Sequence, residues 1–100
     1  MFRTTFLLKR LEGDSKESFE HRWLNDHLPM VEKIPGIDHI IKSRVVTVGG
    51  PAADFDAITE IVWDNEAAFR EALLSPEGQA CVADIASFTS AHDYVVVERA

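Results

Sequence analysis

The stretch FDAITEIVW, residues 55–63, is rich in β-branched and aromatic side chains and predicts a strand near the middle of the chain. Before it, IDHIIKSRVVTV at residues 37–48 predicts another strand, which closes at the Gly-Gly-Pro run of residues 49–51. After it, Asp64 or Asn65 is suited to cap a helix that begins with EAAFREALL. The stretch therefore joins a pair of strands to a helix.

Further strands and helical segments are predicted on both sides of this centre. Ser15 is a suitable N-cap because acidic residues follow it, where they complement the helix dipole. A Ser-Pro-Glu sequence starts the last helical segment in the same way, with proline at its first position. The strands are expected at residues 2–11 and 94–98, and the helical segments at about 15–33 and 75–88.

The resulting order, β-α-β-β-α-β, is that of the ferredoxin-like split βαβ fold. We therefore expect one α+β domain over residues 1–100, with a four-stranded antiparallel sheet and helices on one face. A sheet with one wet face should alternate between apolar and polar residues, but YVVVE and ITEIVW do not. We expect a second copy to cover the other face in a homodimer; the alternative is an exposed, somewhat hydrophobic sheet.

Composition excludes several classes of function. The formal net charge of −7 comes from 17 acidic and 10 basic residues, and the basic residues are scattered, which argues against nucleic acid as a partner. Cys81 is the single cysteine, so neither an intrachain disulfide nor a cysteine-based metal site is expected. The apolar amino terminus is too short for a signal peptide, and no window reaches the length of a membrane span. These features predict a soluble cytoplasmic protein.

A histidine occupies an unexpected place in the segment SFEHRWLNDHLPMVEKIPG, residues 18–36. With Phe19 at zero and about 100° per residue, Trp23 and Met30 fall within about 40° of it. His27 falls near 80°, inside the same apolar arc. The helix is therefore predicted to point an imidazole at the core or at a pocket in it.

Pro29 makes the same turn irregular. Proline inside a helix removes one main-chain hydrogen bond and crowds the preceding turn, so a kink or widening is expected just after His27. Such a turn can open a cavity beside the imidazole, which Phe19, Trp23 and Val31 would then line. The alternative is that the ring bonds a neighbouring polar group and only fixes the helix.

Two stretches of the chain together resemble a known family. The pattern F-x3-W-x3-H-x-P-x-V, followed by Pro-Gly, is present around His27. Residues 55–88 carry a strand with an acid, a helix with an acidic cap, Ser-Pro-Glu and an Asp-x3-Phe motif. Over nearly the whole chain, the sequence resembles the EthD family of the dimeric α+β barrel superfamily. The family takes its name from a gene cluster for the degradation of ethyl tert-butyl ether.

The resemblance implies a fold more than an activity. Members of this family form homodimers by packing two ferredoxin-like sheets together. Better understood relatives in the superfamily include methylmuconolactone isomerases, polyketide cyclases and cofactor-free monooxygenases, whose pockets hold small aromatic or lactone-like molecules. The resemblance assigns His27 to the histidine of the motif, where a pKa near neutrality suits it to act as acid or base.

Glu60 is a second candidate, because it lies in the middle of a strand whose two faces are both expected to be covered. Such a carboxylate should be paired or should have a raised pKa. We prefer an ion pair with Arg44 or Lys42 of the preceding strand; the sharper alternative is a general acid.

Asp84 and Tyr94 complete the set of candidates. Asp84 belongs to the Asp-x3-Phe motif and is expected to bond a backbone group or to reach His27. Tyr94, the single tyrosine, is either a pocket hydroxyl or a core residue with a satisfied hydroxyl. The four histidines lack the spacing of a metal motif, so neither a metal nor another cofactor is predicted.

Two functions remain open on the sequence alone. In the first, the protein is a cofactor-free isomerase, cyclase or monooxygenase-like enzyme in which His27 moves a proton on a small organic catabolic intermediate. In the second, it is a non-catalytic dimer that binds a small ligand or assists a neighbouring enzyme. A second polar group within reach of the histidine or the ligand would favour the enzyme, and a cavity with His27 alone would favour binding.

Overall fold

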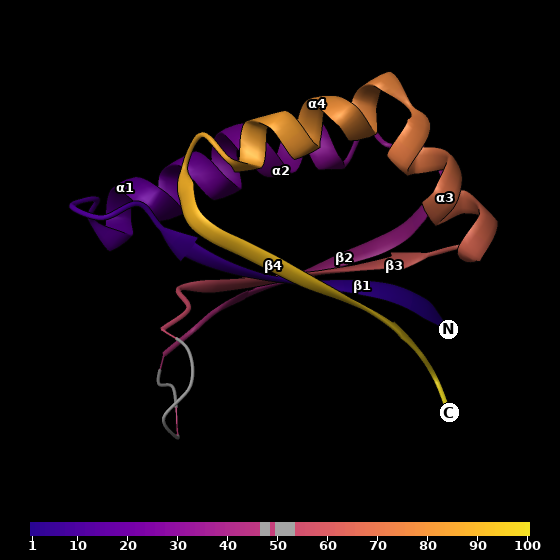
Figure 1. Ribbon diagram of the computed structural model, residues 1–100, viewed down its shortest axis with the longest axis horizontal. Coiled ribbons are helices and arrows are strands. Elements are labelled where there is room, and N and C mark those ends of the chain that lie inside the picture. Colours follow the sequence, from indigo (N-terminus) through magenta and orange to yellow (C-terminus); the bar gives the residue numbers. More distant parts are fainter. Residues whose placement is uncertain (47–48, 50–53) are drawn as a thin grey trace.

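The sheet has four antiparallel strands in the order β2-β3-β1-β4, and every helix lies on one of its faces (Figure 1). This computed structural model describes residues 1–46, 49 and 54–100. The predicted ferredoxin-like arrangement is confirmed. The strands are β1 (Phe2–Arg10), β2 (Ile37–Arg44), β3 (Ala57–Trp63) and β4 (Thr89–Glu98).

All four strands differ from their predicted bounds: β1 ends one residue early and β3 begins two residues late, whereas β2 and β4 differ by more. β4 begins at Thr89, five residues before the predicted start, because SAHD continues the pairing with β1 although it lacks an apolar pattern. β2 ends at Arg44, whereas the prediction extended it to residue 48. The predicted end of that strand at residues 47 and 48, and most of the Gly-Gly-Pro run that follows, lie outside the described residues.

The helix starts follow the predicted capping residues. Ser15 caps α1 (Lys16–His21) by accepting the N–H of Ser18 at 3.0 Å, and Asn65 caps α3 (Glu66–Leu74) through the N–H of Ala68. Ser75 caps α4 (Pro76–Ile85). Each cap satisfies a main-chain donor that the helix itself leaves free, so polar residues at the three starts fix where the helices begin.

The histidine segment contains a π-helix. Between α1 and α2 (Leu28–Val31), the chain forms η1 (Arg22–His27), where the N–H of Leu28 bonds to the carbonyl of Trp23 five residues earlier. Pro29 explains the widening, because it has no N–H to offer and its ring crowds the preceding turn. The predicted irregularity is present, but it ends at His27 instead of beginning after it.

The π-turn changes which side chains of the following helix face the core. On a regular helix Leu28 would lie about 180° from Phe19 and Met30 about 20° from it. One additional residue in the turn sets the following side chains back by about 100°. Leu28 is accordingly only 1% exposed, while Met30 is partly buried at the edge of the core.

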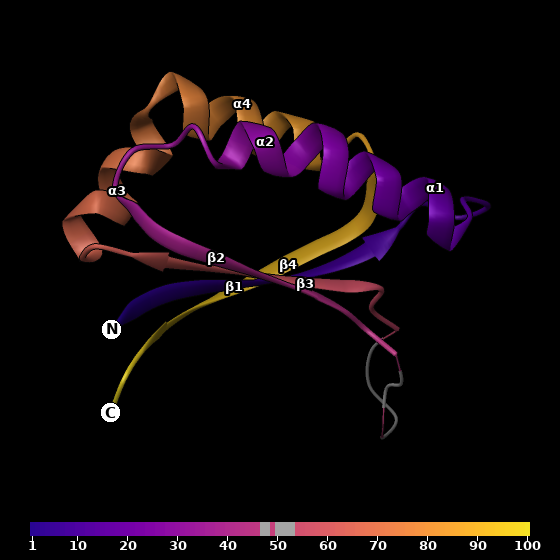
Figure 2. The same ribbon diagram turned by 180° about the vertical axis from the view of Figure 1, so that it is seen from behind.

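Close packing joins α3 and α4. A Cβ on Gly78 would lie 1.8 Å from the carbonyl oxygen of Ala72, so only glycine fits there. This contact places α4 directly above the sheet, beside η1 and α2, as the view from behind shows (Figure 2). α2 and η1 therefore pack along α4, with η1 beside the end of that helix.

The hydrophobic core fills the space between the helices and the sheet. The opposite face of the sheet carries no helix in either view (Figures 1 and 2). Residues opposite each other in an antiparallel pair share a face, so the strand registers define this open face. Its members are Arg3, Thr5, Leu7, His39, Ile41, Ser43, Ile58, Glu60, Val62, Asp93, Val95 and Val97.

No helix within the described ranges is both long enough and apolar enough to cross a membrane.

Candidate functional site

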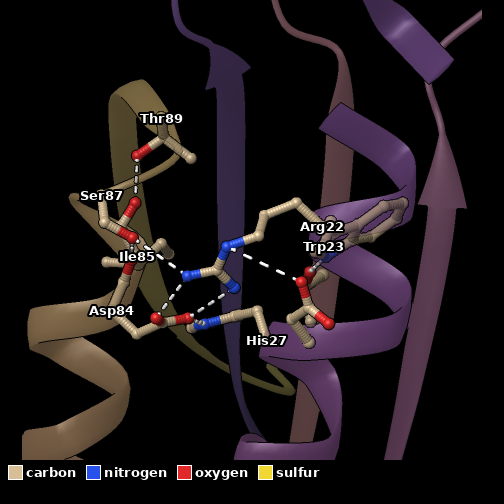
Figure 3. A network of polar contacts seen from close by, with 9 residues as sticks. Arg22, Trp23, His27, Asp84, Ile85, Ser87 and Thr89 are labelled. Carbon is tan, nitrogen blue, oxygen red and sulfur yellow. Dashed lines mark hydrogen bonds and ion pairs between the residues drawn. The ribbon is translucent and has the colours of Figure 1, made fainter. Parts of the chain in front are cut away.

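Arg22, His27 and Asp84 form a polar network where η1 faces the end of α4 (Figure 3). The His27 Nδ1 lies 2.8 Å from one carboxylate oxygen of Asp84. The Arg22 guanidinium donates to both oxygens of the same carboxylate, at 2.5 and 3.2 Å. It also donates to the hydroxyl of Ser87 at 3.1 Å. One carboxylate thus connects the histidine to a two-point arginine contact.

The ring of Phe88 packs against both partners of this carboxylate. Its centroid lies 5.0 Å from that of the His27 ring and 5.0 Å from the Arg22 guanidinium carbon. Phe88 is 3% exposed and His27 is 4% exposed. The two residues of the Asp-x3-Phe motif therefore act together. Asp84 forms hydrogen bonds with His27 and Arg22, and Phe88 excludes water from one side of these two side chains.

The charges in the network set its protonation states. Burial lowers the pKa of His27 below its usual value, and the contact with Asp84 opposes that shift only in part. The Arg22 hydrogen bonds hold the pKa of the Asp84 carboxyl below its ordinary range. At neutral pH, Asp84 is therefore ionised and His27 is neutral.

These protonation states determine the tautomer of His27. An ionised carboxylate can only accept hydrogen bonds, so the Nδ1 beside Asp84 must carry the proton. A neutral imidazole has one protonated nitrogen, which leaves a lone pair on Nε2. Among the described residues, Asp84 makes the hydrogen bond to this ring, and it does so at Nδ1. Nε2 is therefore the nitrogen available to a ligand.

His27 lines a cavity of about 470 Å³ between the helices and the covered face of the sheet. The walls are largely apolar, and they include the ring pairs Phe6–Tyr94 and Trp63–Phe69. Polar residues also line it, namely Thr59, His92, Tyr94 and Asp93, although the strand register points the Asp93 side chain toward the open face. A volume of this size suits a small organic molecule.

Comparison with known proteins identifies the family. The model of the EthD domain matches residues 11–92, which is most of the chain. The chain belongs to the EthD family. A relative from Rhodococcus erythropolis, described as an uncharacterized 11.0 kDa protein in the thcB-thcC intergenic region, is 27% identical over 90 residues. That match covers 90% of this chain and 85% of the relative.

Solved structures agree with this fold. An EthD family protein from Bacillus halodurans C-125 has a TM-score of 0.84 and 24% identity, with 100% of both chains covered. A dimeric ferredoxin-like protein from Thermobifida fusca has a TM-score of 0.73 and 17% identity, covering 98% of this chain and 90% of the other. At these identities the likeness concerns the fold alone.

The residues predicted to surround His27 divide into two groups. Val31 and Tyr94 line the same cavity as the histidine. Phe19 and Trp23, which belong to the EthD-type motif, lie in the packed core and not among the cavity-lining residues. Trp23 still contributes indirectly, because its indole N–H donates at 3.0 Å to the hydroxyl of Thr59, which lines the cavity.

Glu60 lies apart from the site, on the open face of the sheet. Its carboxylate is 3.7 Å from the Arg3 guanidinium of β1, so the preferred partner from β2 was wrong. The register explains the difference, because Lys42 lies opposite Thr59 on the covered face and Arg44 pairs with Glu20 of α1. A carboxylate on the far face cannot serve the cavity of His27.

Arg22 is the member of the network that sequence reasoning missed. It stands directly before the Trp of the EthD-type motif, on a part of the helix that the regular wheel assigns to solvent. The signal that could have found it is Asp84, since a carboxylate near a buried histidine requires a charge or donor to keep it ionised. No cluster of three potential metal ligands occurs within the described part of the chain.

Proposed function

We propose that this EthD family protein is a cofactor-free enzyme of the isomerase or cyclase type, which moves a proton on a small organic molecule bound beside His27. The observation that carries the proposal is the 2.8 Å contact of His27 Nδ1 with Asp84 in the wall of a cavity of about 470 Å³, from which we infer a lone pair on Nε2. A histidine base held in position and in one tautomer contributes about 10²–10⁴-fold to a proton transfer.

The proposed step uses only groups of this chain. Nε2 takes a proton from a carbon next to a carbonyl group, and the electron pair of that C–H bond moves to form an enolate. The imidazolium then returns the proton to oxygen or to another carbon, which gives an enol or a double-bond isomer. Asp84 stabilises the transient imidazolium through Nδ1, and Arg22 holds Asp84 in place.

A homodimer is part of the proposal. On the open face, Val95 of β4 is 51% exposed and Ile41 of β2 is 41% exposed, so both edge strands present large aliphatic side chains to water. Two such faces packed together would remove this apolar surface from water. The dimeric description of the Thermobifida fusca structure supports the same arrangement.

One observation favours non-catalytic binding instead. His27 already packs on Phe88 and bonds Asp84, so the ring is satisfied at one nitrogen without any ligand. A histidine with these contacts also serves to fix a helix. The second candidate is therefore a dimer that holds a small ligand in the cavity without changing it.

Hydrogen–deuterium exchange separates the two candidates. 2-Tetralone and α-angelica lactone carry acidic C–H bonds next to a carbonyl group, and NMR in D₂O follows the loss of those protons. We expect the protein to accelerate exchange of one of them by about 10²-fold or more over the variant His27→Asn. Binding without acceleration would support the second candidate and overturn the enzyme.

The variant is chosen to preserve the fold. The Asn side-chain amide can place its NH₂ near the position of Nδ1 and still donate to Asp84, while nothing replaces Nε2. His21→Asn is the matched control, because His21 is exposed on α1. If the rate of ligand C–H exchange falls equally in His27→Asn and His21→Asn, a role for His27 is contradicted.

A further inference from the structure

The charge of the cavity wall restricts what it can bind. Among the described residues that line the cavity, none is Lys or Arg, and the strand register places the Asp93 carboxylate on the open face. Arg22 does not compensate, because its guanidinium is paired with Asp84 and lies 3.9 Å from Asp26. A carboxylate or phosphate entering this site would lose water without gaining a cationic partner.

The shape of the wall favours a flat ligand. The rings of Phe6 and Tyr94 stack with centroids 5.2 Å apart, and those of Trp63 and Phe69 lie 5.5 Å apart. All four rings line the cavity. Aromatic side chains contribute most to binding when they meet another planar apolar surface.

The tautomer of His27 determines which polar group such a ligand must present. Because Nδ1 donates to Asp84, Nε2 offers a lone pair and no hydrogen. A ligand hydroxyl can donate to this nitrogen, whereas an ether or an ester oxygen would meet it lone pair to lone pair. A ligand that turns only acceptor atoms toward Nε2 would therefore leave this nitrogen unpaired.

We propose that the cavity selects uncharged, planar ligands that donate a hydroxyl hydrogen, of the phenol or enol class, to His27 Nε2. The inference rests on the proposed function for the assignment of this cavity as the binding site. It goes further by naming the ligand class and by excluding carboxylates and methyl ethers. An enol is also the product expected when Nε2 removes a proton next to a ketone.

Three matched probes test the proposal: 2-naphthol, 2-methoxynaphthalene and 2-naphthoate. Isothermal titration calorimetry at pH 7.5 should give a Kd for 2-naphthol that is about three- to tenfold lower than that for the methyl ether, which corresponds to one hydrogen bond. 2-Naphthoate should bind at least about tenfold more weakly than 2-naphthol. A methyl ether that binds as tightly as the naphthol, tightest binding of the naphthoate, or no binding of any probe would overturn the proposal.

Variants locate the preference at His27. His27→Asn should reduce the ratio of the two dissociation constants to about one, whereas Tyr94→Phe, which removes another cavity hydroxyl, should leave it unchanged. Loss of the preference in Tyr94→Phe alone would contradict the assignment. If His27→Asn does not fold, the three probes with the wild type and Tyr94→Phe still decide the question.

The two proposals fail separately. A clear preference for 2-naphthol without accelerated exchange of 2-tetralone or α-angelica lactone leaves the ligand class standing and removes the enzyme. Accelerated exchange without a preference for the hydroxyl leaves the enzyme standing and removes the proposed ligand class.

Discussion

At the scale of single residues, the site depends on one carboxylate that has two partners. Asp84 orients His27 through Nδ1, and Arg22 holds Asp84 ionised through two hydrogen bonds. This arrangement follows the general logic in which an acid fixes the tautomer of a histidine. The arginine adds a second function, since its positive charge also opposes protonation of the histidine.

Replacement of Arg22 should therefore act on Asp84. In Arg22→Met, the pKa of the Asp84 carboxyl should rise, because its largest stabilising contact is lost. Carboxyl ¹³C NMR during a pH titration measures this directly. Arg70→Met is the matched control, since Arg70 pairs with Glu66 on the exposed surface of α3. An unchanged Asp84 titration in Arg22→Met would show that the arginine contact is incidental.

The lowered pKa of His27 predicts a pH dependence of stability. Below 6.5, the unfolded chain protonates this histidine while the folded chain does not, so the free energy of unfolding should fall as the pH falls toward the pKa of the folded state. Asp84 acts at lower pH: its stabilisation is present above 3.8 and is lost as the pH falls through its folded pKa. Urea titrations between pH 7.5 and 5 should show the first effect, and His27→Asn should remove it while His21→Asn retains it.

At the scale of elements, the π-turn decides which residues of the histidine helix are buried. Leu28→Ala should destabilise the protein by about 2–5 kcal/mol, because the side chain is fully packed. Met30→Ala should cost clearly less, since Met30 lies at the edge of the core. A regular helix predicts the reverse order. Urea denaturation of the two variants decides between them, and a larger loss in Met30→Ala would contradict the π-turn.

The element scale also shows how far the sequence could predict the structure. The capping residues and β-branched runs predicted the order of elements and three helix starts, because these signals are local. The strand at residues 89–93 had no such signal; it forms because β1 provides a partner along its length. The partner of Glu60 and the role of Arg22 depend on strand register and on the π-turn, which are set by packing across the chain.

His27 itself was predictable as an inward-facing residue, because the helix period alone places it in the apolar arc. Its contact with Asp84 was one of two open alternatives, since residues 57 positions apart meet only in the folded chain. The cavity was expected from the proline, but its walls come from seven separate elements, from β1 to β4. Features that join distant segments were therefore the ones that sequence patterns left open.

At the scale of the whole molecule, we propose that a second copy covers the open face of the sheet. Light scattering should give a mass of about 22 kDa, twice the 11.2 kDa of one chain. Val95→Glu should shift the mass toward that of one chain, because a charge would be buried in the interface. Leu74→Glu is the control, since Leu74 is 79% exposed at the end of α3, away from the open face. A wild type that stays at 11.2 kDa would contradict the covered sheet.

The account as a whole depends on the protonation of one ring, and ¹⁵N NMR of the His27 imidazole at pH 7.5 tests it most directly. His27→Asn assigns the signals, and exposed His21 and His39 provide references in the same spectrum. The account predicts a neutral ring with the proton on Nδ1, where Asp84 accepts it, and a bare Nε2. A proton on Nε2, or a doubly protonated ring at that pH, would contradict it.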